Sequence, residues 1–492
     1  MKGINASLVA VAAALLPSAV SAESSTLTFT KLWTYSHAPI AGQVSEIPAY
    51  DPKTRTLWIA GVVGVDVLDA ATGTLVDHIS TTVYGFVNSV AIRNGVAAFA
   101  IESSPRTEAG KVLFYSTRSR TPLVGNNPVI VGALPDMLTF TPGGKQLLVA
   151  NEGTPSIYGA RIGTTVPRVY GAAALDPVGS VSIIDVKTRT VIATPGFVGV
   201  PTSGSHLRIG TGMDFEPEYI AVDKDGKRAF VTLQEANAIG VLDLRRKEFT
   251  SVIGLGVKDF SLAGNQIDPL NNAPAPIEFI SPAVKGFYMP DTIAAYRWHN
   301  RTLLVMANEG DFREDDGDRS AASTVGAIAP LNNLRISNTE SSPGNLFAVG
   351  ARSFSIRDTN GILVYDSGDI LDKEAAKRGI YDDGRSRDKG VEPEGVAVKK
   401  IDDRTYAFIG LERTLKAGVA VFDITNPHAV SFIDMIVTDG DVAPEGLVVF
   451  RNRGGYHLAI ANESSNTTTV YRLTDEHDDE DQGEDDDSDH DR

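Results

Sequence analysis

The feature that most constrains the fold is a pair of acidic positions that recurs seven times along the chain. The first member of each pair opens a short apolar strand, and a proline precedes it in five of the seven repeats. The second member closes the strand that follows. The openers are Glu46, Asn88, Asp136, Glu218, Asp291, Glu394 and Glu445, and the closers are Val62, Glu102, Glu152, Gln234, Glu309, Glu412 and Glu463.

The spacing within each pair indicates a hairpin. From opener to closer the separations are 16, 14, 16, 16, 18, 18 and 18 residues, all of them even. Because strand side chains alternate with a period of two, an even change lengthens a hairpin without turning its acids to the other face. A repeat of this kind decides the fold class before any single motif is considered.

Each repeat has the pattern of several short strands separated by turns. In the third repeat, alternating runs at 137–141, 146–151 and 180–186 are separated first by the turn 142–145 and then by a longer insertion. Repeats of about 40–50 residues with four strands are typical of β-propeller blades. The sequence therefore predicts an all-β, seven-bladed β-propeller. The strand-like segment 26–35 precedes the first opener, and we expect it to complete the last blade and close the ring.

Composition divides the chain into three parts. Residues 1–22 hold one lysine and an apolar run that ends in small residues, which predicts a cleaved signal peptide and export to the periplasm or medium. Residues 23–474 would form the propeller. Residues 475–492 carry twelve acids and one arginine, so they account for −11 of the net charge of −17, and we expect a disordered acidic tail. No other run is long enough to span a membrane.

Two further properties narrow the chemistry. The chain has no cysteine, which excludes disulfides and thiolate metal sites. Its acidic character argues against nucleic-acid binding, which needs basic surface for phosphate contacts.

Topology predicts where the repeated acids lie. The inner strand of a blade starts at one end of the central channel and the second strand returns there, so openers and closers should converge. Like charges about 4 Å apart cost about 4 kcal/mol per pair at an effective dielectric constant of about 20, so such a ring needs protonation, basic partners or a bound cation. Oxygen ligands favour Ca²⁺. The candidate ligands are Asp136, Glu152, Glu218, Asp291, Glu309, Glu394, Glu412, Glu445 and Glu463.

Four long insertions should reach the same face. They span 153–179, 255–289, 310–351 and 368–391, and the last one holds a helix-like stretch at 369–379 with an Asp cap and a Gly stop. Loops on a rigid scaffold are common places for function. We therefore expect these insertions to wall in the acidic mouth of the channel.

Several segments resemble the choice-of-anchor I domain family. They include PDMLTFTPGGKQLLVANEG, EPEYIAVDKDGKRAFVTLQEANAIGVLDL, GVEPEGVAV and FIGLERTLKAGVAVFDITNP. The resemblance covers nearly the whole mature chain and implies an exported bacterial propeller, in a family of which some members are described as alkaline-phosphatase-like. Anchored relatives end in a sorting signal, whereas this sequence ends in the acidic tail, so a secreted or periplasmic protein is expected.

The functional hypothesis is a Ca²⁺-dependent phosphoesterase. Bound calcium would clamp phosphate oxygens, and Arg313 and Arg413, which stand beside the acids, would bind phosphate. Two alternatives use the same acids: a lactonase-type hydrolase, and a non-catalytic, calcium-stabilised binding or adhesion module. In a third interpretation the acids only cap backbone groups. The expected partner is a small phosphorylated substrate or an extracellular ligand, bound by a monomer.

Overall fold

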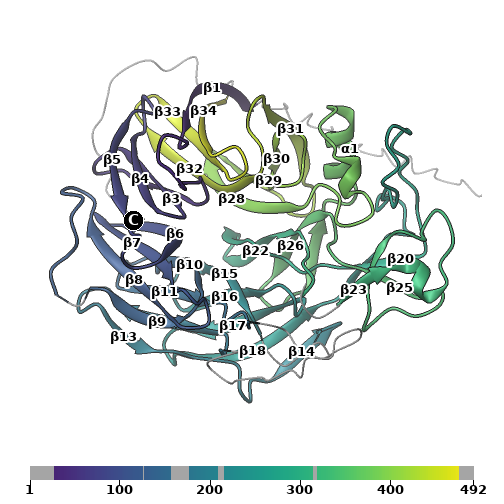
Figure 1. The fold of residues 1–492 in the computed structure, drawn as a ribbon, viewed down its shortest axis with the longest axis horizontal. Helices are drawn as coiled ribbons and strands as arrows, with labels where there is room; N and C mark the ends of the chain where they lie inside the picture. Colours follow the sequence, from purple (N-terminus) through teal and green to yellow (C-terminus); the bar gives the residue numbers. More distant parts are fainter. Residues whose placement is uncertain (1–26, 126, 157–176, 209–214, 314–317, 476–492) are drawn as a thin grey trace, which may run out of the picture.

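The repeated strands form a ring of small sheets. The computed structural model describes residues 27–125, 127–156, 177–208, 215–313 and 318–475. Within them, seven sheets of four or five strands are arranged around a central axis (Figure 1). The predicted all-β, seven-bladed propeller is confirmed. The proposed signal peptide and all but the first residue of the acidic tail lie outside the described residues.

The blades follow one another in chain order, each running from an inner to an outer strand. The first three consist of β2 (Pro48–Asp51), β3 (Thr56–Gly61), β4 (Gly64–Asp69) and β5 (Leu75–Ser80); β6 (Phe86–Arg93), β7 (Val96–Glu102), β8 (Ala109–Ser116) and β9 (Val129–Ala133); and β10 (Pro135–Phe140), β11 (Gln146–Asn151), β12 (Ser180–Asp185) and β13 (Thr190–Ala193).

The remaining blades are more elaborate. They consist of β15 (Pro217–Val222), β16 (Arg228–Leu233), β17 (Ala238–Asp243) and β18 (Glu248–Leu255), with β14 (Thr202–Ser205) added in parallel to β18; β21 (Ile293–Trp298), β22 (Arg301–Asn308), β26 (Ser353–Asp358) and β27 (Leu363–Asp366); β28 (Pro393–Ile401), β29 (Arg404–Leu411), β30 (Ala417–Asp423) and β31 (Ser431–Thr438); and β32 (Pro444–Asn452), β33 (Gly455–Asn462) and β34 (Thr467–Asp475).

The last blade is completed by the first strand of the chain. Strand β1 (Leu27–Ser36) pairs antiparallel with β34, from Leu27 opposite Asp475 to Ser36 opposite Thr467. This is the pairing predicted for residues 26–35. The inner strand β32 also contacts β2, and the seventh and first blades share one buried apolar cluster that includes Leu57, Ile59 and Phe450.

Most inner strands begin with a β-bulge at the opener. The pairing register shifts by one residue between Pro135 and Leu138, and the same shift recurs in the inner strands β6, β15, β28 and β32. In blades one and five, two consecutive residues instead hydrogen-bond to one partner, Ala60 or Ala307. A bulge bends the strand and re-aims the extra side chain, which is an acid in most of these blades.

Two of the insertions fold together outside the ring. Strands β19 (Val257–Asp259), β20 (Val284–Phe287) and β25 (Leu346–Ala348) form one small sheet, and β23 (Arg319–Ala321) and β24 (Arg335–Ser337) form another, with the short helix η2 (Ala322–Val325) beside them. They share an apolar cluster around Phe260, Leu334 and Ile336. We call residues 257–287 and 319–348 the side lobe. Most of the insertion 153–179 lies outside the described residues.

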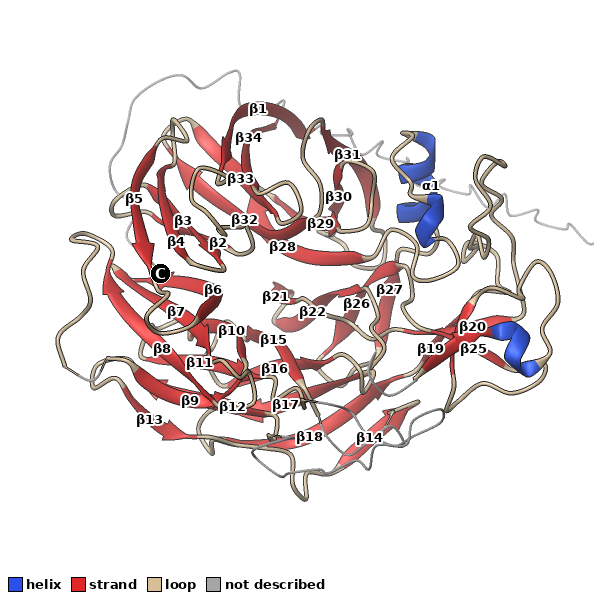
Figure 2. Cartoon of the chain, in the orientation of Figure 1, coloured by secondary structure: helices blue, strands red, loops and turns tan. Residues whose placement is uncertain are grey.

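Within the described residues, helix occurs only in short segments at the edge of the ring (Figure 2). Helix α1 (Ile370–Lys377) and the turn η3 (Asp383–Arg385) lie in the predicted insertion 368–391. The expected Asp369 cap makes no capping hydrogen bond, because its carboxylate lies 2.7 Å from the Lys373 ammonium and accepts the Gln266 amide instead. No helix in the described part of the chain is long and apolar enough to cross a membrane.

Candidate metal and anion site in the central channel

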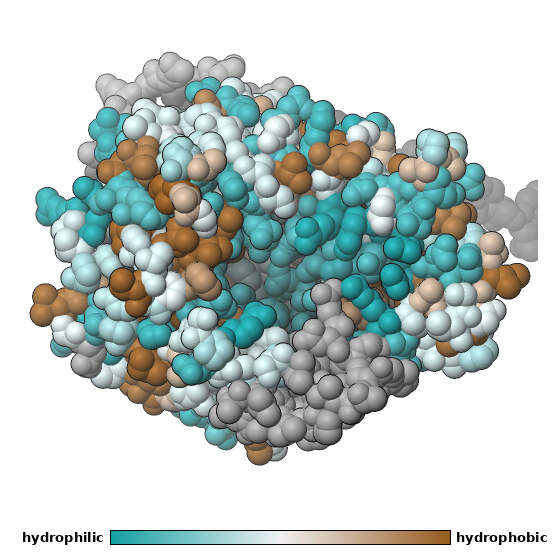
Figure 3. Space-filling model, viewed as in Figure 1, coloured by the Kyte–Doolittle hydropathy of each residue, from teal (hydrophilic) through white to brown (hydrophobic). Residues whose placement is uncertain are grey.

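The acidic side chains of the repeats line the central channel. A cavity of about 500 Å³ is bounded by openers and closers of blades three to seven, together with residues from the insertion before β28. A second cavity, of about 230 Å³, shares Asp136, Asp291 and Glu445 with it. Figure 3 shows hydrophilic side chains gathered around a central hollow on the face that it presents. We call the larger space the acidic cavity.

The structure brings eight of the nine predicted metal ligands into close groups. Within each group, one ligand oxygen of every residue lies within 4.8 Å of the others. The groups are Asp136, Glu152 and Glu218; Asp291, Glu309 and Glu394; Glu309, Glu392 and Glu412; and Glu394, Glu412 and Glu445. The last three groups share members and so form one continuous arc. The ninth candidate, Glu463, lines the smaller cavity with Glu46 and Glu102.

Burial and mutual repulsion raise the pKa values of several carboxyls in the two cavities. Burial, followed by the charges of Glu463, Asp136 and Glu102, raises the pKa of Glu46 to about 8. Burial also raises the pKa of Asp136 to about 6 and that of Glu412 to about 7. The same two causes hold the pKa well above the usual carboxyl range in Glu152, Glu218, Asp291, Glu394 and Glu445. A bound cation would stabilise the charged forms.

Among the described residues, basic side chains occupy one wall of the acidic cavity. The Lys389 ammonium lies 2.6 Å from Glu309 and 3.0 Å from Glu392. The guanidinium of Arg385 lies 2.5 Å from the other oxygen of Glu392, and that of Arg413 lies 2.6 Å from Glu412. The acidic cavity therefore contains two kinds of carboxylate. Glu309, Glu392 and Glu412 are ion-paired, whereas the carboxylates of blades three, four and seven that line it make no ion pair among the described residues.

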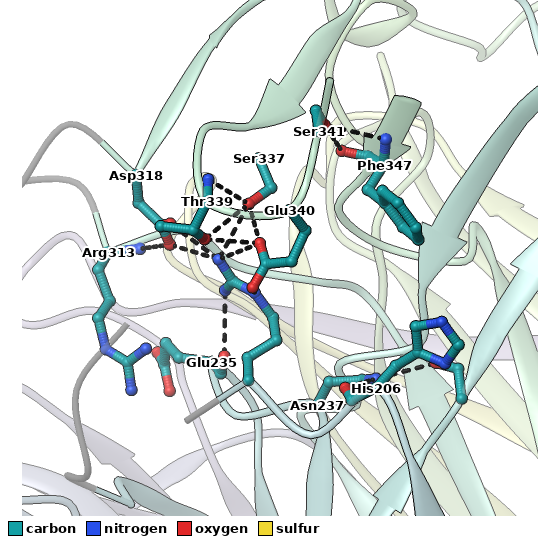
Figure 4. Close-up of polar contacts among 12 residues, drawn as sticks. His206, Glu235, Asn237, Arg313, Asp318, Ser337, Thr339, Glu340, Ser341 and Phe347 are labelled. Carbon is teal, nitrogen blue, oxygen red and sulfur yellow. Dashed lines mark hydrogen bonds and ion pairs between the residues drawn. The ribbon is translucent and has the colours of Figure 1, made fainter. Parts of the chain in front are cut away.

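The two predicted phosphate ligands have different positions. Arg413 lines the acidic cavity and is about half exposed. Arg313 is buried and lines neither acidic cavity. Its Nε lies 3.7 Å from a carboxylate oxygen of Glu216, and Figure 4 shows its guanidinium beside the side chain of Glu235. Arg313 thus lies behind the cavity wall. Burial raises the pKa of the Glu235 carboxyl, and the charge of Arg313 offsets part of that rise.

The donor set fits a hard divalent cation. Every ligand in the four groups is a carboxylate oxygen, and Ca²⁺ prefers such ligands. Glu394 Oε2 and Glu235 Oε2 are buried, and neither has a hydrogen-bond partner among the described residues. Buried acceptors without partners are costly, so these two atoms mark places that a cation or water would satisfy.

Sequence reasoning missed several residues of the acidic cavity and its surroundings. Glu392 and Glu216 both precede the proline before an opener, in the tripeptides Glu392-Pro393-Glu394 and Glu216-Pro217-Glu218. The Glu-Pro-Glu pattern is a signal that could have identified them.

Glu392 has a φ of 49°, and three other pre-proline residues have similar positive values, namely Leu134, Met289 and Ala443. Lys389 and Arg385 belong to an insertion with no repeat to align them.

The fold and the site define a β-propeller whose central channel holds a ring of buried carboxylates. The family model of the choice-of-anchor I domain matches residues 46–427, which is most of the chain. The chain belongs to the choice-of-anchor I domain family.

Other comparisons concern the fold alone. A chain in the crystal structure of a mitotic checkpoint complex aligns with a TM-score of 0.51 and 11% identity, over 96% of this chain and 98% of that one. The β-propeller domain of Cps50 (Swd1) from Myceliophteria thermophila aligns with a TM-score of 0.46 and 10% identity, over 91% and 100%. No curated protein matches the sequence.

Proposed function

We propose that the protein is an exported, calcium-binding propeller that hydrolyses phosphate esters in the acidic cavity. The observation that supports this proposal is the mixed lining of the acidic cavity. Carboxylates from blades three, four and seven, which make no ion pair among the described residues, line it together with ion-paired basic side chains from blade six and the insertion before it. A phosphate ester needs both kinds of partner, since cations neutralise its oxygens and guanidinium groups bind them in a fork.

The carboxylates would hold the metal. Asp136, Glu152 and Glu218 form the group that lies farthest in the chain from the basic insertion, and none of the three makes an ion pair in the described part of the protein. Glu394, Glu412 and Glu445 form a second group beside Arg413. When bound, Ca²⁺ supplies charge neutralisation and lowers the pKa of an attached water.

The basic wall would bind and orient the phosphate. Arg413 is the most exposed of the paired cations at the acidic cavity, and Arg319 lines the same space. We assign phosphate binding to Arg413, because its guanidinium reaches the cavity and can exchange Glu412 for an incoming anion. Arg313 would act from behind the wall by holding Glu216 and Glu235.

The test is hydrolysis of a chromogenic phosphomonoester by the purified protein, with added Ca²⁺ and with chelator. We expect calcium-dependent turnover that falls at least about 100-fold in Glu394→Gln, since removing a group that positions the reacting charges typically costs about 10²–10³ in rate. Glu248→Gln is the matched control, because Glu248 is an exposed glutamate at the start of the outer strand β18 and lies outside both cavities.

A second function uses the same site without catalysis. Lys389, Arg385 and Arg413 are each already paired with a carboxylate, which is also what a purely structural ring requires. If no divalent metal supports turnover of phosphate or lactone esters while calcium raises the melting temperature, the protein is a calcium-stabilised binding or adhesion module. Export in either case rests on the sequence of residues 1–22 and is tested by N-terminal sequencing of secreted protein.

A further inference from the structure

Lys389 is the buried cation of the acidic cavity. It lies between η3 and β28, in the insertion that separates blades five and six. Its Nζ is 2.6 Å from Glu309 Oε1, 3.0 Å from Glu392 Oε2 and 3.7 Å from Asp311 Oδ1. The side chain is almost fully buried, so the ammonium has exchanged water for three carboxylates.

Two of those carboxylates belong to a group that could hold a metal ion. Glu309, Glu392 and Glu412 each offer an oxygen within 4.8 Å of the others, and all three side chains are buried. An ammonium ion that contacts carboxylate oxygens from two members of such a group stands where a divalent cation would otherwise bind.

Three further oxygens of this group already have partners from the protein. Gln234 donates to Glu309 Oε2 at 2.9 Å, and Arg385 donates to Glu392 Oε1 at 2.6 Å. Arg413 pairs with Glu412. The protein's own side chains therefore compensate the negative charge of this group. By contrast, Asp136, Glu152 and Glu218 make no ion pair among the described residues.

We propose that Lys389 is a tethered cation that fills one cation position of the acidic cavity and restricts divalent metal to the carboxylates that it does not contact. This inference deepens the proposed function, from which it takes the carboxylate ring as a cation-binding site. It assigns the insertion before β28 a specific role, which is to limit how many metal ions the ring accepts.

Replacing the lysine should convert the occupied position into a metal site. Lys389→Met keeps much of the side-chain volume but leaves Glu309 and Glu392 buried without their shared cation, which is strongly unfavourable. A divalent cation relieves that cost. Lys389→Arg keeps the charge, and the double variant Lys389→Met with Glu309→Gln removes the charge together with one ligand.

The experiment counts bound calcium per folded chain by equilibrium dialysis and elemental analysis, with Ca²⁺ alone and no substrate. We expect Lys389→Met to bind one more ion than the wild-type protein. Lys389→Arg and the double variant should match the wild-type count. A folded Lys389→Met with an unchanged count would overturn the proposal.

Loss of stability in the variant does not weaken the test. Lys389→Met is expected to need calcium to fold, so it is purified in millimolar Ca²⁺ and checked by circular dichroism.

If it stays unfolded there while the double variant folds, calcium cannot replace the ammonium and the proposal fails. If the wild-type protein binds no ion and Lys389→Met binds one, the inference holds and the proposed metal-dependent function fails. If the wild-type protein binds calcium and the variant gains none, the inference fails and the proposed metal site stands.

Discussion

Single acidic residues in β-bulges are the smallest functional unit of this protein. A bulge leaves its extra residue outside the ladder of paired strands, so an acid at that position points into the channel rather than across the sheet. Burial desolvates the acid as well, as it does for Asp136. The bulge therefore accounts for the position of Asp136, and its burial is the main cause of its raised pKa.

We expect the stability of the calcium-free protein to fall as pH rises from about 4.5 to about 8. The pKa of Glu46 rises from 4.5 to about 8 on folding, so the folded state holds a proton that the unfolded state releases. That contribution is complete below pH 4.5 and is lost as pH passes about 8. Melting temperature in chelator, measured between about pH 5 and 8.5, checks this, and Glu46→Gln should flatten part of the slope. A chelated protein that becomes more stable over this interval contradicts the expectation.

The sequence predicted that these acids converge, as they do around the two cavities, but it could not show how they are aimed, and their role as metal ligands stays a prediction. Even spacing was enough to predict that Glu152, Glu309 and Glu412 lie near their openers, because period-two alternation is a property of any strand. The bulges were not predictable, since they depend on which backbone groups pair. The partners Lys389 and Arg385 were missed for a different reason: they reach the channel through tertiary packing of an insertion.

Among the larger elements, strand β1 is fastened to its neighbours by buried polar side chains as well as by its ladder. His37, the residue after β1, bonds to Asp66 at 2.5 Å and to Thr468 at 2.8 Å. His78 bonds to the other oxygen of Asp66 at 2.6 Å. These contacts join three segments from the first and last blades at the point where the two ends of the ring meet.

His37→Ala should destabilise the fold by about 3 kcal/mol. It leaves one oxygen of the buried Asp66 carboxylate without its partner and removes one of the two hydrogen bonds of the Thr468 hydroxyl, which keeps its bond to Ser45. Leaving a buried polar group unsatisfied costs about 1–3 kcal/mol. His78→Ala is the matched control, since His78 is partly exposed and water can take its place beside Asp66. Urea unfolding measures both free energies. Equal losses in the two variants would contradict the role given to His37.

A buried ion pair lies where the side lobe joins the ring, between Arg208 and Asp318, the residue just before the lobe strand β23. Arg208 donates from Nη2 to both oxygens of Asp318, at 2.8 and 3.0 Å, and from Nη1 to the backbone carbonyl of Glu235. Glu235 lines the acidic cavity, so the lobe and the cavity wall share one anchor. The hydroxyl of Ser337 and the side chain of Glu340 complete this cluster (Figure 4).

Arg208→Met should loosen the side lobe. Removing one partner of a buried ion pair costs about 3–5 kcal/mol, because the other charge stays buried. Relative to the wild-type protein, we expect hydrogen exchange in the variant to become faster in residues 319–348 and to stay unchanged in the blade strands. Arg246→Met, which breaks the exposed pair with Glu248, serves as the control and should leave exchange unchanged in both regions. Uniformly faster exchange over all seven blades would mean that Arg208 supports the ring and not the lobe.

At the scale of the whole molecule, the propeller brings residues from distant repeats to one axis. Blades three to seven supply the acidic cavity, so no single blade carries a complete site. The number of blades and the place of convergence were predictable from the repeat. The side lobe was not, because its strands come from two insertions that the repeat does not describe.

Calcium should stabilise the intact protein. A cation that binds only the folded ring adds about 2.7 kcal/mol when its concentration is about 100 times the dissociation constant, so the melting temperature should keep rising with calcium concentration. Differential scanning calorimetry over a calcium series measures this. A melting temperature that does not change up to millimolar calcium would contradict metal binding at the ring.

The pairing of β1 with β34 also sets an order in time. Thr28 bonds to a residue 446 positions further along the chain, so the first strand has no permanent neighbour until the last one has been made. Nearly the entire polypeptide must be synthesised before β1 and β34 can pair. During that interval the chain remains unfinished, which is the condition in which a polypeptide can still be threaded through a narrow membrane pore.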